Sequence, residues 1–103
     1  MPGVLHALRV LDLSWGIAGP MTAMLMADHG ADVIKIDPPD GDQFEQLLGY
    51  RVWQRSKRRA AIDLHSEIGR AAFLKLVGGA DVLIESFSPG TMDRMGLGFA
   101  ALP

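Results

Sequence analysis

The chain has 103 residues, of which 49% are hydrophobic and 21% charged, and its formal net charge is −2. This length allows one domain at most, and the composition is that of a globular protein rather than a disordered one. The charge favours neither nucleic acid nor a membrane as a partner, and the lack of cysteine excludes disulfides and thiolate metal sites. We see no signal peptide and no apolar run of membrane-spanning length, so we expect a cytoplasmic protein.

The first structured segment reads as a strand, a tight turn and a helix. The apolar run Leu8–Leu13 predicts the strand, and the apolar spacing over Met21–His29 predicts the helix, with Gly30 ending it. We expect Pro20 at the first helical position, where its missing N–H costs nothing. In an open α/β sheet this junction lies where ligands bind, because free N–H groups at a helix start can hold an anion. We therefore expect the ligand site there.

The second strand is predicted over the β-branched run Val33–Asp37 and is ended by Pro38–Asp42. From Pro38 to Ser56 the periodic pattern of apolar residues weakens, which indicates a long loop. A short helix over Gln43–Leu48 is expected within it. Loops of this length in compact domains are often functional.

A third strand is predicted over Ala60–Leu64, followed by a second long helix. Ser66 has the residue type of an N-cap, and Glu67 suits the first turn of a helix electrostatically. The apolar face of this helix continues to Val77 and ends at Gly78-Gly79.

A short pattern occurs twice: Gly30-Ala31-Asp32-Val33-Ile34 returns as Gly79-Ala80-Asp81-Val82-Leu83-Ile84, each time after a predicted helix. Such a unit leads from a helix into a buried parallel strand, as β-α-β crossovers require. The second copy opens a fourth strand, Val82–Glu85, and Thr91–Met95 forms one helical turn. We expect an α/β fold, an incomplete Rossmann-like parallel sheet with covering helices, which would be marginally folded or would aggregate in isolation.

Eight runs along the chain carry a resemblance to a known family: Arg9–Ser14, Ala18–Pro20, Gly30–Ile36, Lys57-Arg58, Ile62–Leu64, Ala80–Glu85, Ser88–Gly90 and Asp93–Gly98. In this order and spacing they resemble the N-terminal part of the class III CoA-transferases, which include formyl-CoA transferase, carnitine CoA-transferase and α-methylacyl-CoA racemase types. The resemblance implies that residues 1–103 form the N-terminal part of a Rossmann-like domain that binds coenzyme A, the first part of the family's large domain, with the remainder of the enzyme absent from this chain.

The resemblance also implies an activity. Members of the family move CoA between an acyl-CoA thioester and a carboxylic acid through an aspartyl intermediate, a form of nucleophilic catalysis that needs no metal. The catalytic Asp would lie beyond residue 103, so we expect this chain alone to be inactive and the full-length protein to be an interlocked homodimer. Two alternatives within this interpretation are an α-methylacyl-CoA racemase and a truncated, inactive fragment.

By position against the family, the residues expected to contact coenzyme A follow several of the predicted strands. We expect Arg94 to pair with a phosphate, because a guanidinium can do so bidentately. Relative to formyl-CoA transferase, Pro38 replaces an arginine, His65 a lysine and Ser86 an asparagine. The full set of expected contacts is Ile17, Ala18, Ile62, Asp63, Leu64, His65, Ser86, Phe87, Ser88 and Arg94.

Three features have more than one interpretation. Trp15 either lines the acyl pocket or packs in the core. Asp37 ends the second strand about 20 residues after the Gly turn, where an NAD-dependent dehydrogenase holds ribose hydroxyls, although the turn is not G-x-G-x-x-G. The basic run forms either a phosphate-attracting edge or a solvated face, and consists of Arg51, Arg55, Lys57, Arg58 and Arg59.

Overall fold

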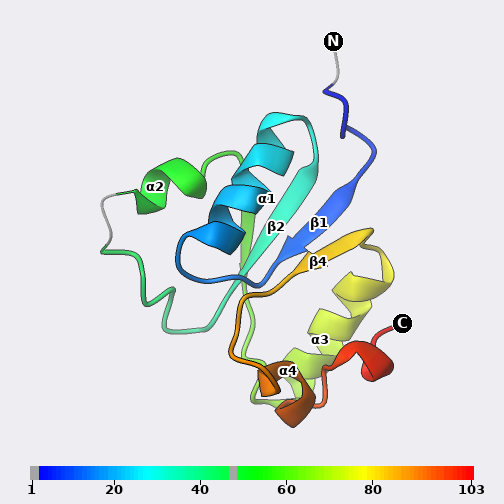
Figure 1. The fold of residues 1–103 in the computed structure, drawn as a ribbon. Coiled ribbons are helices and arrows are strands. Elements are labelled where there is room, and N and C mark those ends of the chain that lie inside the picture. Colours follow the sequence, from blue (N-terminus) through cyan, green and yellow to red (C-terminus); the bar gives the residue numbers. More distant parts are fainter. Residues whose placement is uncertain (1–2, 47–48) are drawn as a thin grey trace.

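The computed structural model describes residues 3–46 and 49–103. Its sheet has four strands in the order β3-β2-β1-β4, and every neighbouring pair is parallel. The carboxyl ends of the strands therefore lie at one edge of the sheet (Figure 1). The predicted α/β fold with a parallel sheet is confirmed. The strands are β1 (Arg9–Asp12), β2 (Asp32–Asp37), β3 (Arg58–Ala61) and β4 (Val82–Ile84).

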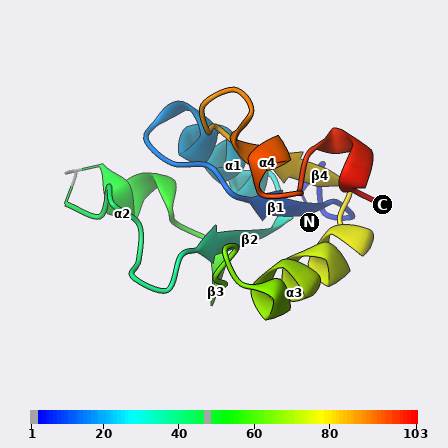
Figure 2. The same ribbon diagram turned by 90° about the horizontal axis from the view of Figure 1, so that it is seen from below.

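Helices cover both faces of the sheet. The two long ones lie on opposite faces, α1 (Ala18–Asp28) on one and α3 (Glu67–Gly78) on the other (Figure 2). Two shorter helices, α2 (Tyr50–Trp53) and α4 (Thr91–Arg94), and a 3₁₀ turn at Phe99–Ala101 complete the elements. Among the residues described, no helix combines the length and apolar character needed to cross a membrane.

The core has two parts because successive side chains of a strand point to opposite faces. On β1, Val10 joins Ala23 of α1 and Val33 of β2 in one cluster. Leu11 joins Phe73 of α3 in the cluster on the other face. The central strands are thus buried on both faces, as parallel sheets with helical crossovers require.

The predicted helix ends are partly confirmed. At the start of α3, the Ser66 hydroxyl accepts a hydrogen bond of 2.9 Å from the Gly69 N–H. After α1, Gly30 has φ +102°, a left-handed conformation that suits glycine. The predicted start of α1 is wrong, because the helix begins at Ala18 and Pro20 is its third residue. Pro20 is tolerated there because the N–H groups of the whole first turn lack a partner within the helix.

The predicted bounds of the third strand, Ala60–Leu64, are also wrong. Hydrophobicity is a poor guide here because β3 lies at an edge of the sheet and its first residues carry charge. Arg58 bonds to the Asp32 carboxylate on β2 with Nη2–Oδ2 2.6 Å. The Ile62 N–H still donates to the Asp37 carbonyl at 2.8 Å, so the ladder continues one residue past β3.

The predicted short helix over Gln43–Leu48 is not found where the structure can be described. Turns occupy residues 43–46, while Leu47 and Leu48 lie outside the described residues. The helical turn in this region is α2, which begins at Tyr50.

A buried ion pair joins the central strand to the segment after α2. The Lys57 ammonium donates to Asp12 Oδ2 at 2.7 Å, and both side chains are 0% exposed. It also donates to the Pro20 carbonyl at 3.1 Å and to Gln54 Oε1 at 2.9 Å. Burial lowers the pKa of Lys57 below its usual value, although the Asp12 carboxylate favours the charged form. One ammonium group thus connects β1, α1 and the residue that follows α2.

We expect Lys57→Met to lower the free energy of unfolding by about 3–5 kcal/mol in a denaturant titration, because it leaves the Asp12 carboxylate buried without its counter-ion. The matched control is Arg58→Met. The Arg58 side chain is 64% exposed, and an exposed ion pair contributes at most about 1 kcal/mol. Equal losses in the two variants would contradict this assignment.

Tyr50 packs against Arg59 of β3. Its side chain is buried, its hydroxyl accepts a hydrogen bond of 3.1 Å from Arg59 Nη2, and the guanidinium carbon lies 5.9 Å from the ring centroid. Burial raises the pKa of Tyr50 to about 12, and the Asp37 carboxylate acts in the same direction while Arg59 opposes them. Between about pH 10 and 12 the folded chain therefore keeps the hydroxyl proton of Tyr50, whereas the unfolded chain loses it.

Tyr50 is the only tyrosine in the chain, so tyrosinate absorbance reports on it alone. We expect a titration midpoint near pH 12 rather than near 10, the usual pKa of a tyrosine hydroxyl. The stability that this group contributes is present below about pH 10 and is lost as the pH rises through about 12. Tyr50→Phe should remove that alkaline loss. A midpoint near 10 would show that the ring is not buried in this way.

Candidate functional site

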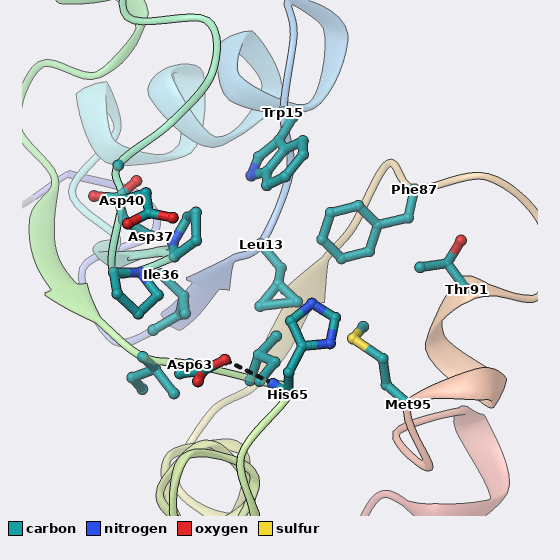
Figure 3. A pocket seen from close by; sticks show the side chains of 15 residues that line it. Leu13, Trp15, Ile36, Asp37, Asp40, Asp63, His65, Phe87, Thr91 and Met95 are labelled. Carbon is teal, nitrogen blue, oxygen red and sulfur yellow. Dashed lines mark hydrogen bonds between the residues drawn. The ribbon is translucent and has the colours of Figure 1, made fainter.

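A cavity of about 660 Å³ opens at the carboxyl edge of the sheet. Its walls come from the residues that end or follow all four strands and from α4 (Figure 3). Because the loops after parallel strands meet at this edge, the fold itself brings these distant segments together. The lining residues are Leu13, Trp15, Ile36, Asp37, Pro38, Pro39, Asp40, Gly41, Ile62, Asp63, Leu64, His65, Phe87, Thr91 and Met95.

Several residues expected to contact coenzyme A lie around this cavity. Ile62–His65 and Phe87 line it, although they are more than 20 positions apart in the sequence. Ser86 and Ser88 line a second, shallower cavity of about 330 Å³, which shares Trp15, Phe87 and Thr91 with the first.

The remaining expected contacts lie elsewhere. Ile17 and Ala18 are exposed at the start of α1 and line neither cavity. Arg94 is exposed on α4, and its Nη2 donates to Thr91 Oγ1 at 3.0 Å. Thr91 lines both cavities, so the Arg94 guanidinium lies one residue away from their walls.

Trp15 and Phe87 form a common wall of the two cavities. Their rings meet edge to face, with centroids 5.5 Å apart and an interplanar angle of 87°. The Ser86 hydroxyl accepts from the Trp15 N–H at 2.9 Å and donates to the Trp15 carbonyl at 3.0 Å. These contacts fix the loop after β4 against the loop after β1. Trp15 therefore packs against another ring and lines both cavities, and its role in an acyl pocket stays a prediction.

Two glycines shape the junction between β1 and α1, Gly16 in the loop and Gly19 in the first turn of the helix. Gly16 has φ +86°, which a residue with a side chain adopts only with strain. At Gly19, a Cβ atom would lie 2.3 Å from Cβ of Ser14, so the chain can fold back on itself only with glycine at this position.

Apolar surface and carboxylates surround the main cavity. Among the described lining residues the acidic groups are Asp37, Asp40 and Asp63, and none is a lysine or arginine. Asp37 accepts a hydrogen bond of 3.0 Å from Arg59, and Asp63 Oδ1 accepts one of 2.9 Å from the His65 N–H (Figure 3). Carboxylates repel phosphate and accept hydrogen bonds from hydroxyl and amino groups. The arrangement suits an uncharged part of a ligand.

Four of the five residues of the basic run pair with carboxylates, while the fifth, Arg51, is exposed on α2. Arg55 makes two hydrogen bonds to the Asp28 carboxylate, at 3.2 and 2.6 Å. Arg58 and Arg59 pair with carboxylates of β2, and Lys57 is buried. Each of these four cations thus has a carboxylate partner, which lies between 22 and 45 positions away in the sequence.

A second buried cation was not foreseen from the sequence. Lys35, in the middle of the predicted strand, has a fully buried side chain that reaches the loops after β1 and β2. The only local sign of this buried cation in the sequence is a lysine within a β-branched run. That pattern does not identify the carboxylate with which Lys35 pairs. Asp42 lies at the end of Pro38–Asp42, the segment that ends the predicted second strand, and no local pattern there predicts an ion pair.

The chain is similar to known proteins in both sequence and fold. Residues 5–103 match the model of CoA-transferase family III. The chain is 41% identical to succinyl-CoA:mesaconate CoA-transferase of Haloarcula hispanica, over 97% of this chain and 28% of that protein. It is 38% identical to succinyl-CoA–D-citramalate CoA-transferase of Chloroflexus aurantiacus, over 98% of this chain and 28% of that protein. The chain thus spans about 28% of the length of these relatives.

Solved structures agree in fold. A crystal structure of a Mycobacterium tuberculosis protein superposes with a TM-score of 0.93 and 37% identity, covering 97% of this chain and 28% of that one. A CaiB/BaiF family protein from Brucella suis gives a TM-score of 0.88 and 32% identity, covering 98% of this chain and 30% of that one. Sequence match and fold lead to the same conclusion: the chain belongs to CoA-transferase family III.

Proposed function

We propose that this chain supplies the coenzyme-binding part of a longer family III enzyme, which moves CoA between an acyl-CoA thioester and a carboxylic acid. The observation that carries the proposal is the cavity at the carboxyl edge, whose walls include Ile62–His65 and Phe87. These are residues for which the family resemblance implies coenzyme contact. The names of the relatives, which are transferases for mesaconate and D-citramalate, favour transfer over racemisation.

In this proposal the charged and uncharged parts of coenzyme A bind in different places. The apolar side chains of Leu64, Phe87 and Met95 pack against an uncharged part of the coenzyme inside the main cavity. The phosphates stay outside the cavity, because the carboxylates of Asp40 and Asp63 line it, whereas Asp37 is already paired with Arg59. Arg94, exposed beside Thr91, offers a guanidinium to a phosphate at the rim.

The residues of this chain bind and orient the thioester, and the covalent steps take place elsewhere in the enzyme. In the proposed mechanism a carboxylate of an Asp beyond residue 103 attacks the thioester carbonyl and expels the CoA thiolate, which leaves an acyl-aspartyl anhydride. The thiolate then attacks the aspartyl carbonyl, which releases the donor acid and forms an aspartyl-CoA thioester. The acceptor carboxylate attacks that thioester in turn, and the thiolate it expels attacks the acceptor carbonyl of the new anhydride, which forms the product thioester and frees the Asp. Holding the coenzyme against a rigid sheet edge converts this attack into a step between positioned groups. We further propose that the enzyme acts in the cytoplasm as an interlocked homodimer.

Arg94→Ala in the full-length enzyme tests this assignment. The phosphate contact persists from bound substrate through the transition state, so its loss weakens binding without slowing the chemical step. We expect the KM for the acyl-CoA to rise roughly ten- to a hundredfold, since a hydrogen bond to a charged group contributes about 1.5–3 kcal/mol. The turnover number kcat should change little.

Arg51→Ala is the matched control, because Arg51 is an exposed cation on α2 that lines neither cavity. Its KM should equal that of the wild type. An unchanged KM in Arg94→Ala would remove Arg94 from the coenzyme site. A full-length protein that binds no CoA thioester in equilibrium titration would refute the proposed function itself.

A further inference from the structure

The Lys35 ammonium group lies between two of the loops that form the cavities. Its side chain is 0% exposed, and Nζ donates to the Ser14 carbonyl at 3.0 Å and to Asp42 Oδ2 at 2.9 Å. Asp37 Oδ1 lies 3.6 Å away and has no hydrogen-bond partner among the described residues. The three protons of this ammonium group thus face the loop after β1, the loop after β2 and the end of β2.

Asp42 extends this connection into the second loop. Its side chain is 1% exposed, and its other oxygen, Oδ1, accepts a hydrogen bond of 2.8 Å from the Phe44 N–H. The carboxylate therefore joins Lys35 to the backbone of residues 42–44. An ionised group that is buried and bonded through both oxygens has little freedom to move.

The residues next to Ser14 and Asp42, the two residues bonded to Lys35, line the cavities. Trp15 follows Ser14 directly and lines both cavities, while Gly41 precedes Asp42 and lines the main one. Phe44 lines the second cavity together with Trp15. Neither Lys35 nor Asp42 lines either cavity.

We propose that Lys35 and Asp42 are a positioning pair, which holds the loops after β1 and β2 at the separation that the ligand requires and thereby sets the affinity for CoA thioesters. The inference rests on the proposed function, since the ligand is the coenzyme named there. Stability alone does not account for the pair, because well-packed apolar residues in place of a buried ion pair are often equally stable or more so. Directional bonds from one ammonium to two loops provide what apolar packing lacks, a fixed separation.

The test uses the full-length enzyme with Asp42→Asn, which keeps the size of the side chain and removes its charge. We expect the KM for the acyl-CoA to rise about tenfold or more, because loops that are no longer held in place have to be ordered when the coenzyme binds, with kcat within about twofold of wild type. Asp42→Glu, which keeps the charge, should recover part of the lost affinity. The matched control is Asp32→Asn, because Asp32 pairs with Arg58 at the opposite edge of the sheet and lines no cavity.

A purely structural role predicts a different result, in which less enzyme is folded and the apparent kcat falls while KM stays constant. The double variant Lys35→Met with Asp42→Leu keeps the test decisive if Asp42→Asn does not fold, because it leaves neither charge of the pair buried. We expect it to fold, as judged by thermal unfolding, and to show the raised KM. A wild-type KM in either folded variant overturns this inference alone. Failure of the wild type to bind CoA overturns the proposed function and this inference with it.

Discussion

The structure depends on how two ammonium groups are accommodated in its interior. Asp12 and Lys35 are paired residues on neighbouring strands, and both side chains are fully buried. A charge in such a place costs several kcal/mol unless a counter-ion and hydrogen bonds replace the lost water. Lys57 provides the counter-ion for Asp12, and Asp42 provides it for Lys35. Each of these partners comes from a segment after β2, so the sheet cannot form with its charges paired unless that long segment closes over it.

The two edges of the sheet therefore differ in physical character. At the amino edge, Arg9 and Arg58 pair with Asp32 in partly exposed contacts that solvent screens. At the carboxyl edge, the pairs Lys35–Asp42 and Lys57–Asp12 are buried and hold loops in place, while Arg59, which pairs with Asp37, is half exposed. The cavities open beside these fixed loops, and such an arrangement favours ligand binding because little motion has to be stopped when the ligand arrives. The exposed pair of Arg58 with Asp32 adds a weak contact between β3 and β2, whereas the buried pairs connect the loops beside the candidate site.

Much of the fold follows from local signals in the sequence. The repeated Gly-Ala-Asp-Val pattern predicts two strand entries, and the Ser66 cap predicts the start of α3, because both rest on interactions within a few residues. The bounds of β3 were mispredicted because an edge strand carries charge where a buried strand carries apolar residues. The carboxylates that pair with Lys35 and Lys57 could not be predicted. They lie seven and 45 positions away in the sequence, and periodicity does not identify such partners. Family resemblance, not periodicity, indicated Ile62–His65 and Phe87.

The most direct measurement is a crystal structure of the full-length enzyme with coenzyme A bound. We predict that the coenzyme lies at the carboxyl edge of this sheet, with an uncharged part against Phe87 and Ile62–His65 and a phosphate beside Arg94. Coenzyme bound at another face of the protein, with the cavity beside these residues left unoccupied, would contradict the proposed function.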